Sequence, residues 1–164
     1  MSISVVDNPA DRPAWIRETL QLVTAAGAAE RRSLLHLVEQ ATDGDLAAGS
    51  ADAWGLGQVA VHLLLVDRGV LGIALRLARG EAAGATGQPR PAADAVTRAG
   101  IQALAAKAAA AATELLRAFP EAPDAATARH PYYGDLNCFG WLLTIPNHYA
   151  AHLAAWREGR PSAL

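Results

Sequence analysis

Apolar residues recur every three or four positions along four long stretches of the chain, which is the spacing of an α-helix with one buried face. Polar segments rich in glycine and proline separate these stretches, and such segments typically break helices. We therefore expect four helices, at about residues 13–40, 50–80, 92–119 and 138–157. Valine and isoleucine are too scattered to predict a sheet. The pattern predicts an all-α protein whose four helices form a four-helix bundle.

Several residues at the predicted helix starts are types that favour a helix N-terminus. Pro13 suits the start of the first helix, with Asp11 as its candidate cap, and Ser50 is a candidate cap for the second. Either Asp135 or Asn137 could cap the fourth helix. The connections at about 42–45, 81–91 and 121–137 are predicted to be loops.

Three residues inside the predicted helices are poor helix formers. Gly69 and Gly72 lower the propensity of the second helix, and we expect them to let a neighbouring helix come close. Pro146 removes one backbone hydrogen bond from the fourth helix and is expected to kink or split it.

The length of the chain supports one domain over residues 1–164, because 164 residues fit a single hydrophobic core. Hydrophobic residues make up 52% of the chain but aromatic residues only 5%, so the core must consist mainly of Leu, Ala and Val. Alanine, the commonest residue, is also the best helix former.

Charge and cysteine content restrict the partners and the compartment. The formal net charge is −2 and the basic residues form no stripe, so we expect no nucleic-acid binding. Cys138 is the only cysteine, which suits the reducing cytoplasm. The first twelve residues lack the apolar segment of a secretory signal. The most apolar region, 56–66, is too short to span a bilayer, so no membrane association is expected.

Three histidines form the strongest candidate site. His148 and His152 are four residues apart, which places them about 40° apart on one face of a helix. His62 lies in the middle of an apolar face of the second predicted helix. If both faces point inward, three imidazoles can bind one metal ion and leave a coordination position open, as catalytic sites require.

Simpler interpretations of these histidines exist. The HxxxH pattern often occurs by chance in helices, and a single histidine on an apolar face is more often a hydrogen-bonded core residue. Three buried imidazoles, however, carry six ring nitrogens that need partners among mostly aliphatic neighbours. A shared metal would satisfy three of them at once, so we favour a metal site over a bundle without metal.

Three segments, in this order, resemble the DinB/YfiT-like family: residues 54–67 (WGLGQVAVHLLLVD), 130–137 (HPYYGDLN) and 141–153 (WLLTIPNHYAAHL). The resemblance implies a four-helix bundle, often dimeric, with a three-histidine metal site. Members of the family include thiol-dependent transferases, mycothiol-dependent isomerases and domains of iron enzymes in thiohistidine biosynthesis. The family name refers to damage-inducible expression and implies no DNA binding.

Two polar residues lie one helical turn before a candidate ligand. Gln58 could orient His62, or it could be a polar residue near a helix start. The hydroxyl of Thr144 could reach the site beside His148, but we favour a bond to the backbone carbonyl that Pro146 leaves open.

Other polar residues are expected at the edge of the site or away from it. His130, Tyr132 and Tyr133 lie in the longest loop and could line an entrance, although a structural role in the loop is somewhat favoured. Asp67 is about 140° around the helix from His62, so we expect it in a surface or interhelix ion pair.

These features predict one divalent transition metal (Zn²⁺, Ni²⁺ or Fe²⁺) held by His62, His148 and His152. Such a metal could activate a thiol or water towards a small electrophile, as in a transferase or isomerase that uses a low-molecular-weight thiol, or in a hydrolase. The alternative is a non-catalytic metal-binding or dimerisation module, which the lack of a nearby carboxylate base favours a little. A cleft that reaches the histidines would favour the enzyme. We expect a homodimer with a small-molecule substrate.

Overall fold

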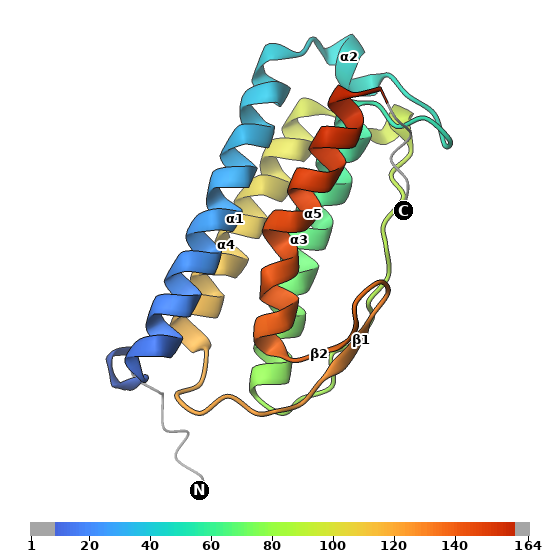
Figure 1. The fold of residues 1–164 in the computed structure, drawn as a ribbon. Helices are drawn as coiled ribbons and strands as arrows, with labels where there is room; N and C mark the ends of the chain where they lie inside the picture. The colour runs from blue at the N-terminus through green and yellow to red at the C-terminus, as the bar shows by residue number, and fades with distance from the viewer. Residues whose placement is uncertain (1–8, 160–164) are drawn as a thin grey trace, which may run out of the picture.

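A computed structural model of the chain describes residues 9–159. Four long helices lie side by side in a bundle, as predicted (Figure 1). They are α1 (Ala14–Gln40), α3 (Leu56–Ala78), α4 (Arg98–Ala118) and α5 (Cys138–Arg157). The smaller elements are α2 (Asp43–Ala47), the 3₁₀ turns η1 (Pro9–Asp11) and η2 (Ala93–Ala95), and the strands β1 (Ala128–His130) and β2 (Gly134–Leu136).

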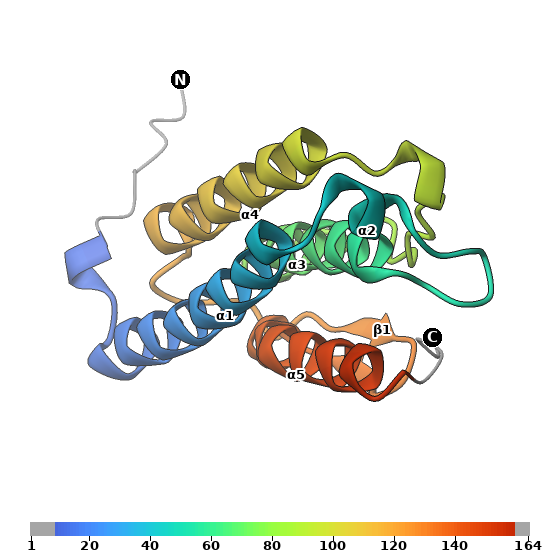
Figure 2. The same cartoon turned by 90° about the horizontal axis from the view of Figure 1, so that it is seen from above.

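The four long helices run in two directions. Helices α1 and α5 run one way and α3 and α4 the other, so the segment 79–97 must return along the outside of the bundle before α4 begins (Figure 1). Seen from above, α3 lies beside both α4 and α5 (Figure 2), and these are the most extensive contacts in the bundle. The long return segment, called the crossover below, therefore passes beside the helices that carry the histidines.

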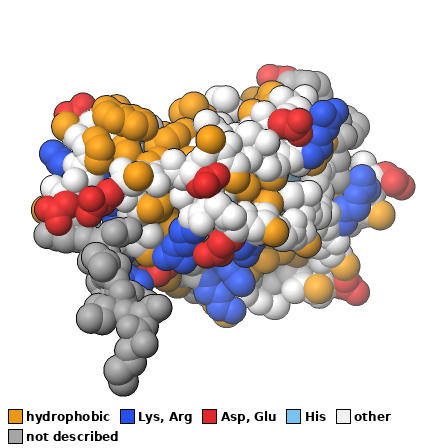
Figure 3. All heavy atoms as spheres, turned by 90° about the horizontal axis from the view of Figure 1, so that it is seen from below, with side chains coloured by type: hydrophobic (Ala, Val, Ile, Leu, Met, Phe, Trp, Pro, Cys, Tyr) orange, Lys and Arg blue, Asp and Glu red, His pale blue; other side chains and the backbone are white. Residues whose placement is uncertain are grey.

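The core is aliphatic, as the composition predicted. Its fully buried large side chains are mostly leucines, and Tyr149 and Phe119 are the aromatic exceptions. On the face seen from below, acidic and basic side chains lie intermixed (Figure 3).

Helix α3 is the most apolar of the long helices, and it makes the most extensive contacts with its neighbours, mainly α4 and α5. The helix continues beyond the apolar region 56–66, and by length and composition alone the whole helix could cross a membrane. Most of this helix is buried inside the bundle, and the core helix of a globular protein passes the same test.

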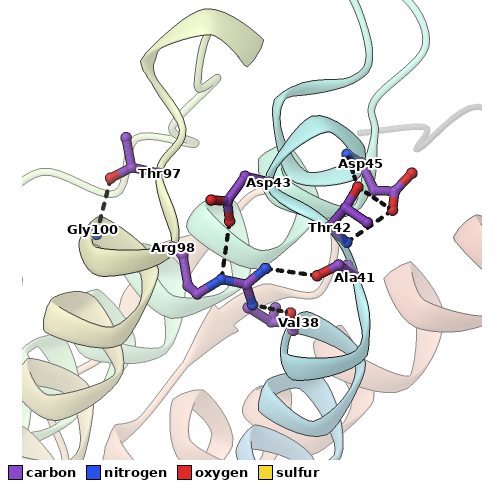
Figure 4. Close-up of polar contacts among 8 residues, drawn as sticks. All are labelled: Val38, Ala41, Thr42, Asp43, Asp45, Thr97, Arg98 and Gly100. Carbon is purple, nitrogen blue, oxygen red and sulfur yellow. Dashed lines mark hydrogen bonds and ion pairs between the residues drawn. The ribbon is translucent and has the colours of Figure 1, made fainter.

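The first helix begins after Pro13 as predicted, but Asp11 lies in η1 and does not cap it. The predicted break after α1 contains the short helix α2. The Thr42 hydroxyl accepts a hydrogen bond from Asp45 N at 3.1 Å, and the Asp45 carboxylate accepts one from Thr42 N at 2.9 Å (Figure 4). This reciprocal pair is a capping box, which the sequence analysis missed.

Arg98, the first residue of α4, joins three segments at one end of the bundle. Its guanidinium donates to Val38 O and Ala41 O, both at 2.6 Å, and to the Asp43 carboxylate at 3.0 Å (Figure 4). One side chain thus satisfies carbonyl groups at the C-terminal end of α1, which have no partner within that helix.

The second long helix begins at Leu56, later than predicted. Ser50 does not cap it, because its hydroxyl accepts hydrogen bonds from Asp52 N and Ala53 N in a preceding turn. The third helix begins at Arg98 and not at residue 92. At the fourth, the side chain of Asn137 accepts from Gly140 N, so Asn137 is the cap of the predicted pair.

Glycines allow close packing near the start of α3 but not at its centre. A Cβ atom at Gly57 would lie 2.0 Å from Leu46 O, so a side chain there would clash with the backbone of α2. A Cβ at Gly69 or Gly72 would meet nothing within 4 Å, so the predicted close helix contact at these residues was wrong.

The predicted loop 121–137 contains a short antiparallel hairpin. Its register pairs Arg129 with Asp135, and Gly134 follows the turn with a φ of +77°. The Trp141 indole N–H donates to Ala128 O at 3.3 Å, which ties the hairpin to α5. Three-residue strands are too short for a hydrophobic pattern to reveal. Pro146 does not split α5, which continues to Arg157.

Candidate metal centre

The structure brings the three predicted histidines together between α3 and α5. His62 projects from α3, and His148 and His152 project from successive turns of α5. One ring nitrogen from each lies within 4.8 Å of the others, and the ring centroids are 4.5–5.0 Å apart. His62 and His152 are buried and His148 is half-buried. This cluster could hold a metal ion.

His62 is oriented by the crossover and not by its own helix. Its Nδ1 atom lies 2.7 Å from Pro89 O. A carbonyl oxygen only accepts, so Nδ1 carries the proton and the Nε2 lone pair faces the other histidines. Metal-binding histidines commonly have such a hydrogen bond on the second ring nitrogen. No pattern in the sequence pairs Pro89 with His62, because the two residues are 27 positions apart and lie on different segments.

The imidazoles are uncharged at neutral pH because burial opposes protonation. Burial is the main cause that lowers the pKa of His148 to about 3 and that of His152 to about 4. The neighbouring histidines lower both values further. Burial likewise lowers the pKa of His62, and the Pro89 bond opposes this shift. Neutral imidazole is the form that binds a metal.

Two further observations show that the residues fit a transition metal. The Nε2 atoms of His62 and His148 are 3.2 Å apart, close to the separation of about 3.4 Å for two nitrogens bound tetrahedrally to zinc. The Nδ1 atom of His152 is buried and has no hydrogen-bond partner within the described part of the chain. Polar atoms buried in this way usually have a partner.

A cavity of about 430 Å³ reaches the cluster from one side. His148 and His152 form part of its wall, and His62 lies behind them. Helix α3 contributes an apolar wall that includes Leu65, Val66 and Ile73. The crossover and the hairpin form the rim, so the cluster is not sealed in the core.

Three hairpin residues line this cavity, which is the less favoured of the two roles considered for them from the sequence. His130, Tyr132 and Tyr133 lie along its wall, and each tyrosine is 60% exposed. The Gln88 amide on the crossover donates to the Tyr132 hydroxyl at 3.4 Å, which joins the two sides of the rim. His130 stacks on Tyr133, with ring centroids 4.8 Å apart.

Comparison with known proteins identifies the family. Residues 26–155, which include the three histidines and the cavity, match the model of the DinB superfamily. The chain belongs to the DinB superfamily. It is also similar to TT2238, a solved structure described as a four-helix bundle protein, with 30% identity and a TM-score of 0.64. The match covers 85% of this chain and 98% of that one. A search of curated proteins finds no match.

Of the two roles considered for Gln58, the structure of this DinB superfamily protein supports a polar residue at the start of a helix and not one that orients His62. Its amide donates to Ser50 O at 3.0 Å and to Pro91 O at 2.9 Å, while its carbonyl accepts from Gly55 N. Gln58 therefore fixes the crossover against the start of α3, and its hydrogen bonds do not go to His62.

Thr144 matches its predicted role only in part. Its hydroxyl donates to Trp141 O at 2.7 Å, which is a backbone bond as favoured. The carbonyl that would have bonded to the nitrogen of Pro146 belongs to Leu142, one residue later. Thr144 also lines the cavity, so its methyl-bearing side chain is part of the wall.

Asp67 forms the predicted interhelix ion pair, but in the core and not at the surface. Its carboxylate lies 3.0 Å from the Arg31 guanidinium on α1 and accepts a hydrogen bond from the Tyr149 hydroxyl on α5 at 2.9 Å. Burial raises the pKa of Asp67, and the Arg31 charge opposes the shift. This contact joins the two helices that carry the histidines to α1.

Proposed function

We propose that this DinB superfamily protein is a metal-dependent enzyme in which His62, His148 and His152 hold one divalent transition metal, Zn²⁺, Ni²⁺ or Fe²⁺. The observation that carries the proposal is the convergence of three uncharged imidazoles at the wall of an accessible cavity. The activity is the activation of a thiol or a water molecule towards a small electrophile, as in a thiol transferase, an isomerase or a hydrolase.

When bound, the metal supplies Lewis acidity that lowers the pKa of a coordinated water or thiol. The chain's own residues prepare the site. Pro89 O holds the proton on Nδ1 of His62 and so directs Nε2 to the cluster. Aliphatic side chains such as Leu65 and Ile73 limit the water around the reacting groups. Three protein ligands leave a coordination position for the substrate.

The alternative is a non-catalytic module that binds a metal or another copy of the chain. One observation favours it: among residues 9–159, no carboxylate lines the cavity as a candidate general base. The cavity itself favours the enzyme, because a purely structural metal needs no access for a substrate. A cytoplasmic homodimer acting on a small molecule is part of the same proposal.

Elemental analysis of the purified protein tests the metal site. We expect about one metal ion per chain, and loss of most of it in His152→Ala. His36→Ala is the matched control, because His36 is exposed on α1 and its ring is hydrogen-bonded to Gln40. Equal metal content in all three proteins would contradict the assignment. A metal-free protein with undiminished turnover of an identified substrate would refute the catalytic part alone.

A further inference from the structure

The wall of the cavity carries no formal charge among the residues that the structure describes. Its side chains are aliphatic, aromatic or neutral polar, and no Asp, Glu, Lys or Arg from residues 9–159 is part of it. The neutral polar groups are few and include Thr86, Gln88 and Asn147.

A second cavity shows that the lack of charge is particular to this site. It lies between α1 and α4 and is of similar size, about 450 Å³, but Arg31, Arg32 and Glu39 line it. Arg90 is a charged residue that acts on the histidine cluster, because it lowers the pKa of His62 electrostatically. Arg90 is exposed and does not line the cavity.

We propose that the cavity beside the histidines binds a small molecule whose enclosed part is uncharged and largely apolar, such as an aromatic ring or a branched alkyl group. The inference rests on the proposed function in one respect. The proposed function supplies the reactive group, such as a thiol, that the bound molecule presents to the histidines. The described wall offers no charge of its own, so an ammonium group, or a carboxylate enclosed away from the metal, would lose its hydration without gaining an opposite charge. Charged parts of a substrate, including those of a low-molecular-weight thiol, must therefore remain outside the rim.

Gly69 leaves space for this ligand. It lines the cavity, and a Cβ atom at this position would meet nothing within 4 Å. Gly72 lies one turn further along α3, has the same free space around a Cβ, and does not line the cavity. Leucine is a better helix former than glycine, so Gly69→Leu and Gly72→Leu should both fold. Only Gly69→Leu should fill the site.

A pair of thiols tests the substrate class. Benzyl mercaptan and 4-(mercaptomethyl)benzoate carry the same thiol and ring, and they differ by one carboxylate. We expect the full-length, zinc-loaded protein to bind the neutral thiol roughly ten-fold more tightly or better in calorimetric titration. The same preference is expected in the metal-free protein, where a carboxylate cannot simply coordinate the metal.

The glycine variants locate the binding. We expect Gly69→Leu to weaken binding of benzyl mercaptan roughly ten-fold, and Gly72→Leu to leave it unchanged. Any of three results would overturn the inference. The protein could bind 4-(mercaptomethyl)benzoate as tightly as benzyl mercaptan or more tightly, it could bind neither thiol, or the two glycine variants could bind benzyl mercaptan equally. The metal content of the same samples is measured separately. If no metal binds, the proposed function fails, while the comparison in the metal-free protein still decides the class of ligand.

Discussion

At the scale of single residues, the protein holds each of the three imidazoles in a different way. His62 has a fixed proton because Nδ1 donates to Pro89 O. His152 has a buried Nδ1 with no hydrogen-bond partner among residues 9–159, and His148 is the one that remains half-buried at the cavity wall. All three resist protonation, so their lone pairs are available over a wide range of pH.

The lowered histidine pKa values predict a pH dependence of stability. In the unfolded chain these imidazoles bind protons near pH 6.5, whereas folded His148 and His152 do so only near pH 3 and 4. The unfolded state therefore binds more protons in this interval, and the metal-free protein should lose on the order of 5 kcal/mol of stability between pH 7 and pH 4. Urea unfolding measures this loss.

A comparison of variants isolates the histidine contribution. His148→Gln should reduce the loss of stability on acidification, while His36→Gln, at an exposed position, should not change it. Asp67 acts in the opposite direction because its pKa is raised, so its stability contribution improves as the pH falls. Identical pH profiles for wild type and His148→Gln would show that the His148 imidazole does not have a lowered pKa.

At the scale of elements, the site depends on how α3 and α5 are rotated against each other. Asp67 lies on α3, the helix of His62, and Tyr149 lies on α5 next to His148. The Tyr149 hydroxyl donates a hydrogen bond to the Asp67 carboxylate at 2.9 Å. The contact therefore fixes the same pair of helices that presents the histidines. Arg98 has a comparable role at the end of the bundle, where it joins α4 to α1 and α2.

Tyr149→Phe removes the phenolic donor and leaves the buried Asp67 carboxylate with Arg31 as its remaining partner among residues 9–159. One oxygen of this carboxylate already has no hydrogen-bond partner within residues 9–159. We expect a loss of about 1–3 kcal/mol in the free energy of unfolding. Tyr133→Phe is the control, because Tyr133 is 60% exposed and should change stability little. Equal stability of the two variants would show that the Tyr149 hydroxyl contributes nothing.

Arg98→Ala should destabilise the bundle by about 1–3 kcal/mol, because two carbonyls of α1 and the Asp43 carboxylate lose their donor. Arg117→Ala serves for comparison, since Arg117 pairs with Glu114 on the surface of the same helix. Such exposed pairs contribute little. Thermal or urea unfolding of both variants measures the difference, and a larger effect at Arg117 would contradict the structural role of Arg98.

At the scale of the whole molecule, the candidate site is built where four segments meet. Helices α3 and α5 supply the histidines, the crossover supplies Pro89 and Gln88, and the hairpin supplies His130 and the exposed tyrosines. The crossover reaches the site because α3 and α4 run in the same direction, which forces the chain to return along the bundle (Figure 1). Chain direction in the bundle thus decides what forms the rim of the cavity.

Long elements were predicted from the sequence more accurately than short ones. Long amphipathic helices were predicted because apolar spacing repeats over many turns. The hairpin at 128–136 and helix α2 were missed because three to five residues are too few for such a repeat. The helix starts at Ser50 and residue 92 were placed too early, because the preceding turns contain residue types that also favour caps.

The sequence by itself determined the helical class, the aliphatic core and the shared face of His148 and His152, because these depend on local spacing along one helix. Only the tertiary structure decided that His62 meets this pair, that Pro89 orients it and that an uncharged cavity reaches the cluster. Each of these depends on contacts between segments far apart in the chain, and the spacing of residues within a single helix contains no information about the rotation of its neighbour.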